Sequence, residues 1–78
     1  MVSFKIGTVN AYYAKLSMMA VDLTAEIHLG DLVSINSQEF KISKIKNEHI
    51  FIDFARKGET VVINADFPVA IGDELVRS

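Results

Sequence analysis

Few side chains in this 78-residue sequence have the types and spacing that catalysis or metal binding requires. The two histidines, His28 and His49, lie in different segments, and cysteine is absent, so a zinc site would need carboxylates brought in by the fold. No serine has the Gly-x-Ser-x-Gly context of a hydrolase nucleophile, and no glycine pair has the spacing of a phosphate-binding loop. We therefore expect no catalytic residue, no metal ligand, no cofactor and no GTP site, and predict that the chain is not an enzyme.

Positive charge is concentrated between residues 41 and 57, in a chain whose net charge is −2. This stretch contains two carboxylates and five cations, namely Lys41, Lys44, Lys46, Arg56 and Lys57. If the stretch folds as a β-hairpin, these cations share one edge, where they can contact the phosphates of RNA. If their rings are exposed, Phe51, Tyr12 or Tyr13 could then stack on bases. The alternative is that the lysines only protect a strand against pairing with another sheet edge.

The apolar residues that must position these groups alternate with a period of two, and many are Val, Ile or Phe. This pattern predicts an all-β chain with strands near residues 4–13, 19–23, 33–35, 39–47, 50–54, 61–63 and 75–76. Changes of parity at Gly7 and near Ser43 and Lys44 predict two β-bulges. The side chains expected to face the core include Phe4, Tyr13, Ile50 and Phe54.

One short motif occurs three times before an apolar strand. Gly30-Asp31 and Gly72-Asp73 are close copies, and Gly58-Glu59 is a looser one. A glycine at such a point suits a backbone with positive φ, and the acidic side chain can accept hydrogen bonds from nearby main-chain N–H groups. We interpret these carboxylates as turn formers and not as catalytic groups.

The length allows one domain, residues 1–78, with a mass of 8.7 kDa. Regular short strands joined by such turns favour a small closed antiparallel β-barrel of six to seven strands, because closure removes the sheet edges. No apolar run reaches the roughly 20 residues of a membrane helix, and the N-terminal residues lack the pattern of a signal peptide. We therefore expect no membrane association and a cytoplasmic location.

Several segments resemble the second domain of translation elongation factors of the Tu type. In chain order they are KIGTV at 5–9, YYAKL at 12–16, AVDLT at 20–24, LGDLVSI at 29–35, KGETVVI at 57–63 and PVAIGDELV at 68–76. The sequence is most similar to small relatives without a GTPase domain, including the barrel at the end of some U32-family peptidases. The resemblance implies a translation-protein barrel whose partners are tRNA, ribosomal RNA or a translation protein. The RNA-contacting residues of the family cannot be matched to this sequence one by one.

A second candidate surface is apolar. Met18, Phe51 and Val62 alternate with residues expected to face the core, so we expect them on the outside of the barrel. Clustered apolar residues on the outside usually mark a contact surface. The sequence thus favours a non-catalytic binding module that contacts RNA or the ribosome through its basic edge. The alternative is a protein-interaction or homodimerisation module that uses the apolar surface.

Overall fold

The computed structural model describes residues 4–77, and in this range the chain forms short β-strands and one 3-10 turn. The strands are β1 (Phe4–Tyr13), β2 (Met18–Leu23), β3 (Ile27–His28), β4 (Leu32–Ile35), β5 (Gln38–Lys41), β6 (Ile45–Asn47), β7 (Ile50–Ile52), β8 (Phe54–Ala55), β9 (Thr60–Asn64) and β10 (Glu74–Arg77). The 3-10 turn η1 (Ala14–Leu16) connects β1 to β2. The predicted all-β class is confirmed. Within the described residues, no helix has the length and apolar character needed to cross a membrane.

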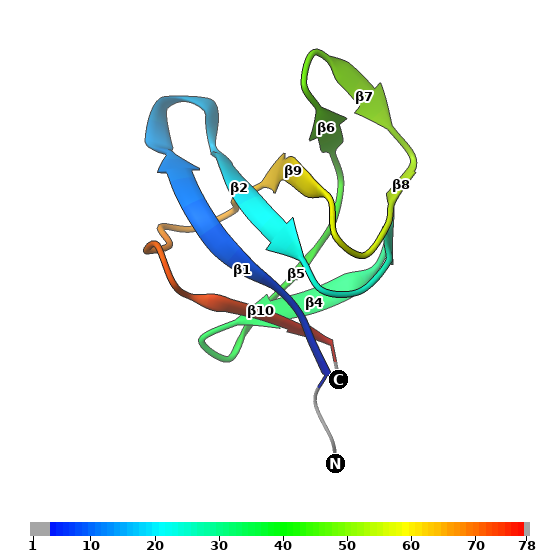
Figure 1. Ribbon diagram of the computed structural model, residues 1–78. Helices are drawn as coiled ribbons and strands as arrows, with labels where there is room; N and C mark the ends of the chain where they lie inside the picture. Colours follow the sequence, from blue (N-terminus) through cyan, green and yellow to red (C-terminus); the bar gives the residue numbers. More distant parts are fainter. Residues whose placement is uncertain (1–3, 78) are drawn as a thin grey trace.

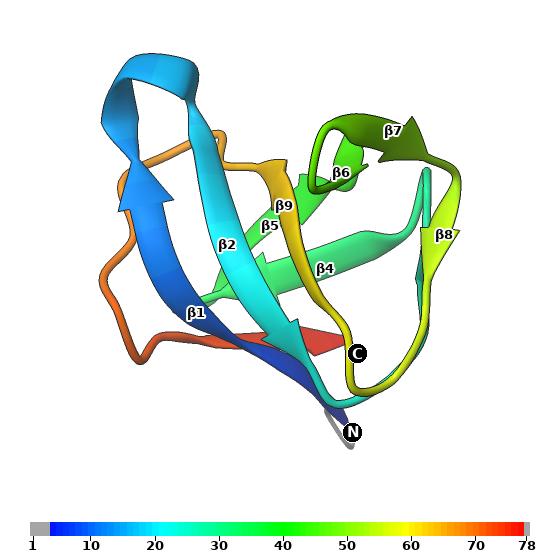
Figure 2. The ribbon, with the colours of Figure 1, turned by 45° about the horizontal axis from the view of Figure 1, so that its top comes forward.

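Most of the strands form one curved antiparallel sheet in the order β5-β4-β10-β1-β2-β9-β6-β7 (Figure 1). Strands β3 and β8 form a separate two-stranded sheet, and Figure 2 shows β8 beside the segment that leads into β4. Over residues 4–77, the end strands β5 and β7 do not pair with each other, so the large sheet is an open half-barrel. The expected closed barrel of six to seven strands is therefore wrong in closure and in strand number.

The strand expected over residues 39–47 is interrupted by a side chain from β9. Asn64 accepts hydrogen bonds at its Oδ1 from the main-chain N–H of Ser43 at 2.8 Å and of Lys44 at 3.4 Å. Its Nδ2 donates to the carbonyl of Lys41 at 3.0 Å. Because these main-chain groups bond to a side chain, they cannot extend a strand ladder. The chain therefore leaves β5 at one end of the sheet and begins β6 near the other end.

The core lies inside the curve of the sheet. The expected inward residues of β2 are confirmed, since Met19 and Val21 are fully buried and Leu23 nearly so. The other large buried side chains are Ile6, Val9, Ile27, Val33, Ile35, Phe40, Ile42, Ile45, Val61, Ile63 and Leu75.

Three apolar residues expected in the core are exposed instead. Phe4 lies at the end of β1, opposite Arg77, beyond the part of the sheet that covers the core. Ile50 closes the β6–β7 hairpin, which extends past the core. Phe54 faces outward while its neighbour Ala55 is buried, because the strand bends and changes parity between β7 and β8.

Strand β1 changes register twice. Its pairing with β10 shifts just before Gly7, which confirms the predicted bulge. Its pairing with β2 shifts again between Val9 and Ala11, and this second irregularity was not predicted. The additional shift packs Tyr12 against the core and leaves Tyr13 exposed, so the expected inward position of Tyr13 is wrong.

The predicted Gly-acid turns form three copies of one hydrogen-bonded structure, at residues 28–31, 56–59 and 70–73. In each turn the glycine, third of the four residues, has a φ between +89° and +97°. The N–H of the acidic residue donates to the carbonyl of the first residue. Its carboxylate accepts the N–H of that same residue, at 2.7 to 2.9 Å. The interpretation of these carboxylates as turn formers is confirmed, including the looser third copy.

Replacing Asp73 by Ala tests the contribution of the capping carboxylate. The change removes the hydrogen bond from the N–H of Ala70 and the contact with Asn36 Nδ2 at 3.2 Å. We expect the free energy of unfolding, measured by urea denaturation, to fall by about 1 kcal/mol. The exposed Glu39→Ala variant on β5 is the control and should change stability by less than about 0.5 kcal/mol. Equal losses in the two variants would contradict the capping role.

Candidate functional site

The five cations that were predicted to share one edge come from four different places in the fold. Lys41 lies on β5 and Lys46 on β6, two strands that are not neighbours in the sheet. Lys44 is exposed in the segment held by Asn64, just before β6. Arg56 and Lys57 lie in the turn between β8 and β9. The structure therefore does not place all five cations on one hairpin, and their role in nucleic-acid binding stays a prediction.

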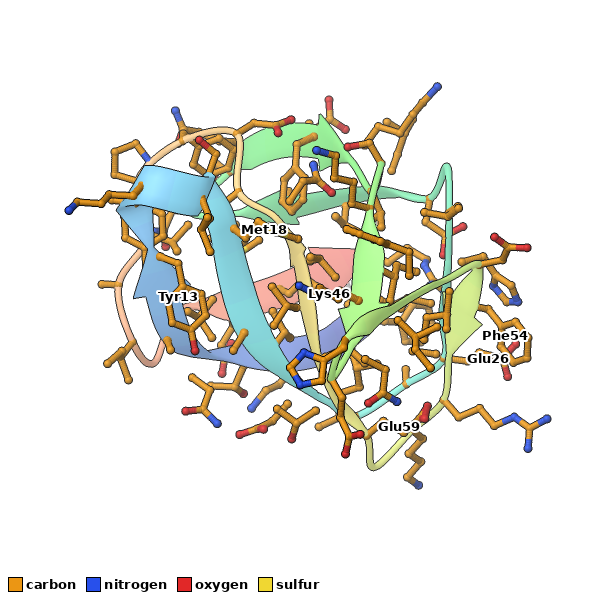
Figure 3. The ribbon with its side chains drawn as sticks, turned by 90° about the horizontal axis from the view of Figure 1, so that it is seen from above. Tyr13, Met18, Glu26, Lys46, Phe54 and Glu59 are labelled. Carbon is orange, nitrogen blue, oxygen red and sulfur yellow. The ribbon has the colours of Figure 1, made fainter. Side chains whose placement is uncertain are left out.

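An open cleft of about 510 Å³ lies between the β6–β7 hairpin and the turn that follows β8. Its lining residues are Asn47, Phe51, Ile52, Asp53, Phe54, Arg56 and Glu59. Phe51 and Phe54 are 63% and 44% exposed, so the cleft offers two large apolar rings to a ligand. In Figure 3, Phe54 and Glu26 project together from one corner of the molecule, on the side away from Tyr13.

Each of these two phenylalanines has a cation over its ring. Lys46 Nζ lies 5.6 Å from the ring centre of Phe51, and Arg56 Cζ lies 5.7 Å from that of Phe54. Both distances are within the range of cation–π attraction. Two of the five predicted cations thus lie beside the cleft together with exposed aromatic rings.

Polar groups complete the cleft and limit its positive charge. Glu59 Oε2 accepts the N–H of Arg56 at 2.7 Å, and Glu59 Oε1 lies 3.5 Å from Asn47 Nδ2. The carboxylates of Glu59 and Asp53 line the same cleft as Arg56. The cleft is therefore close to neutral, and its capacity for binding depends on aromatic surface and on individually placed cations.

The predicted apolar surface is not continuous. Met18 is only 9% exposed and lies opposite Asn64 in the β2–β9 ladder, so it cannot contribute much to a contact surface. Phe51 is exposed and Val62 is half-buried. Lys46 pairs with both of them and places a cation between them. The expectation that Met18, Phe51 and Val62 form one exposed surface is therefore wrong.

The two histidines lie apart in the structure. His28 Nε2 lies 2.8 Å from Glu26 Oε2, and the His28 ring stacks on Phe54 with ring centres 5.9 Å apart. His49 is exposed in the turn between β6 and β7. Within residues 4–77, histidine and carboxylate side chains form no group of three that could hold a metal ion.

Asp22, which does not line the cleft, has a lowered pKa. A hydrogen bond from Thr60 Oγ1 at 2.6 Å, and weaker ones from Asn10 Nδ2, lower the pKa of the Asp22 carboxyl below its ordinary value. These three residues lie side by side on β9, β2 and β1. The carboxylate therefore has a structural role as an acceptor between strands.

The lowered pKa of Asp22 predicts a pH-dependent contribution to stability. A carboxyl whose folded pKa is depressed contributes stability above its unfolded pKa, and this contribution is lost as the pH falls through the folded pKa. Asp22→Asn should therefore lower the thermal midpoint at neutral pH. The difference in thermal midpoint from the parent protein should shrink as the pH falls below about 4, the usual pKa of a carboxyl group. A difference that stays constant with pH would contradict this role.

Comparison with known proteins supports the fold. No family model and no curated protein sequence matches this chain. Two crystal structures are similar to it, both of the C-terminal domain of a Geobacillus thermoleovorans protein assigned to the U32 peptidases. The selenomethionine form has a TM-score of 0.84 and 22% identity, over 95% of this chain and 98% of that one. The other structure has a TM-score of 0.82 and 22% identity, over 92% and 89%.

This comparison defines the chain as a small all-β domain with the fold of a U32 peptidase C-terminal domain. The resemblance to the barrel at the end of those peptidases, predicted from the sequence, is confirmed at the level of the fold. The resemblance to the second domain of Tu-type elongation factors stays a prediction.

Of the cleft residues, sequence reasoning named Phe51 and Arg56 as site residues and missed Asn47, Ile52, Asp53, Phe54 and Glu59. Phe54 was expected in the core because it alternates with Ile50 and Ile52. One sequence feature indicated that Phe54 leaves the alternation of this strand. It is Asp53, a charged residue within an apolar run, at which the strand bends.

Proposed function

We propose that this domain is a non-catalytic binding module that holds an unpaired segment of RNA in the cleft beside β7 and β8. One observation supports this proposal above the others: Phe51 and Phe54 line the same cleft, and each has a cation over its ring. Proteins bind unpaired RNA with this combination, because bases stack on aromatic rings and on guanidinium planes while cations contact phosphates.

The charge of the cleft determines how salt should affect binding. Lys46, Arg56 and Lys57 are the cations near the cleft, and Asp53 and Glu59 oppose them. For two or three phosphate contacts on a single strand, the logarithm of the affinity should fall with the logarithm of the salt concentration with a slope of about −1.4 to −2.1. Stacking on Phe51 should supply most of the salt-independent affinity.

The choice of RNA follows from the sequence resemblance. Likeness to the second domain of Tu-type elongation factors makes tRNA and ribosomal RNA fragments the first ligands to test, and such ligands fit a cytoplasmic location. A fold shared with the C-terminal domain of a U32 peptidase is compatible with a domain that positions a ligand and leaves chemistry to another part of a protein.

The test is fluorescence anisotropy with a labelled, unpaired oligoribonucleotide at several salt concentrations. We expect the double variant Lys46→Glu with Arg56→Glu, and the single variant Phe51→Ala, each to weaken binding by about tenfold. Lys15→Glu is the matched control, because it makes the same charge reversal on η1, next to Tyr13 and on the side of the molecule opposite Phe54 (Figure 3). It should change the affinity by less than about twofold. Loss of binding in the Lys15 variant, or no binding by the parent protein at low salt, would contradict the proposal.

A protein-interaction module is the second candidate function. The exposed Ile50 and Phe51 at the tip of the β6–β7 hairpin favour it, since apolar side chains in such positions are common at contact surfaces. This function predicts either a specific protein partner or a dimer with a sedimentation mass of twice 8.7 kDa. Ile50→Ser should abolish whichever of these associations is present. RNA binding with an unchanged monomer mass would favour the first candidate.

A further inference from the structure

Phe54 has both His28 and Arg56 beside its ring at the border of the cleft. His28 and Phe54 are direct partners in the β3–β8 ladder, and their rings stack with an angle of 25° between the planes. Arg56 Cζ lies 5.7 Å from the centre of the Phe54 ring. Phe54 and Arg56 line the cleft, whereas His28 does not. A change of charge on His28 therefore occurs one aromatic ring away from the ligand site.

Four charged groups surround His28. Glu26 Oε2 lies 2.8 Å from its Nε2. The Asp31 carboxylate accepts its main-chain N–H at 2.9 Å and is already paired with Arg77 at 3.1 Å. Arg56 lies beyond Phe54. Arg77 Nη2 also donates to the main-chain carbonyl of Glu26 at 2.9 Å. In the described part of the chain, the Glu26 carboxylate has one ion pair, with His28, so protonation of the imidazole adds a charge directly at this carboxylate.

We propose that protonation of His28 is a pH switch for the cleft. The imidazolium compensates the charge of Glu26, adds cation–π attraction to Phe54, and makes the border of the cleft more favourable for an anionic strand. Histidine changes its charge between about pH 5 and 8, so the affinity for such a strand should rise as the pH falls through this range. The identity of the ligand rests on the proposed function; the coupling between His28 and Phe54 does not.

The first test measures oligoribonucleotide affinity at constant ionic strength at about pH 5.5, 6.5 and 7.5. The parent protein should bind about three- to fivefold more tightly at the lowest pH, because one exposed charge is screened by water and salt. His28→Gln should remove this dependence. Glu26→Gln should raise the affinity at the highest pH towards the value that the parent reaches in acid.

His49→Gln provides the matched control, since His49 is the other histidine and lies in the β6–β7 turn. It should keep the pH dependence of the parent protein. A dependence that persists in the His28 variant, or that disappears in the His49 variant, would overturn the switch. Isothermal titration should also show proton uptake on binding at intermediate pH, by reciprocity between the two equilibria.

A second test uses the free protein and separates this inference from the proposed function. In an NMR titration, the ring protons of Phe54 should shift together with the ring protons of His28, because the two rings stack. A domain that shows this coupling but binds no RNA contradicts the proposed function and keeps the switch. If the domain binds RNA but the ring protons of Phe54 do not shift when His28 is protonated, the switch is contradicted and the proposed function is not.

Discussion

Replacing Asn64 by Asp should lower the free energy of unfolding by about 3 kcal/mol, because the change removes a buried amide donor and the two hydrogen bonds that it makes. Asn64 is only 6% exposed, and both ends of its amide are used. Its Nδ2 donates to the carbonyl of Lys41 at 3.0 Å and to Asp66 Oδ1 at 3.1 Å. A carboxylate at position 64 has no hydrogen atom to donate. It would lie against the two acceptors that the amide now satisfies, the carbonyl of Lys41 and Asp66 Oδ1. Urea denaturation followed by circular dichroism measures the loss.

Two further measurements keep this prediction specific. Asp66→Asn, combined with Asn64→Asp, offers an amide donor to the new carboxylate, so the double variant should recover part of the loss. Acid should also reduce the deficit, since a protonated carboxyl regains one donor. If the single variant is as stable as the parent, Asn64 does not hold the segment between β5 and β6 as inferred.

Replacing Gly7 by Ala should cost about 2 to 3 kcal/mol, as expected for adding a methyl group to a filled core. A Cβ at this position would overlap Cγ1 of Val21, whose side chain is fully buried. It would also lie 3.1 Å from the main-chain oxygen of Asp22, which the β1–β2 ladder keeps in place. The thermal or urea midpoint measures the effect.

The cause of this loss can be separated from a general preference for glycine. Val21→Ala removes the overlapping methyl group, so the two changes together should cost less than the sum of the single costs. Gly30→Ala is the comparison variant, because a Cβ there meets no atom within 4 Å and the cost comes only from the positive φ. That cost should be about 1 kcal/mol. Additive effects at Gly7 and Val21 would contradict the steric explanation.

Features that depend on a few neighbouring residues could be predicted from the sequence. The turn at 28–31, for example, needs a glycine with positive φ and an acidic side chain next to it, and both requirements are visible in the sequence. The alternation in β2 likewise identified Met19 and Val21 as core residues. The bulge before Gly7 was visible as a change of parity.

Features that depend on one irregular residue in a strand were less accessible. Tyr13 and Phe54 were both expected in the core, and both are exposed because the strand changes parity shortly before them. Alternation is a count that continues from residue to residue, so one missed irregularity reverses every later position in that strand. This is why Phe54 was not predicted in the lining of the cleft, although Phe51 was expected to be exposed.

An all-β chain, its turns, much of its core and a fold shared with a U32 peptidase C-terminal domain could be inferred from residue types and their order along the chain. Three features became visible only in three dimensions: the open sheet, the position of Lys41 and Lys46 on strands that are not neighbours, and the cleft that Phe51 and Phe54 share. The difference lies in the range of the interactions. Turn geometry and alternation depend on adjacent residues, whereas the break after β5 depends on the side chain of Asn64, which arrives from a distant strand.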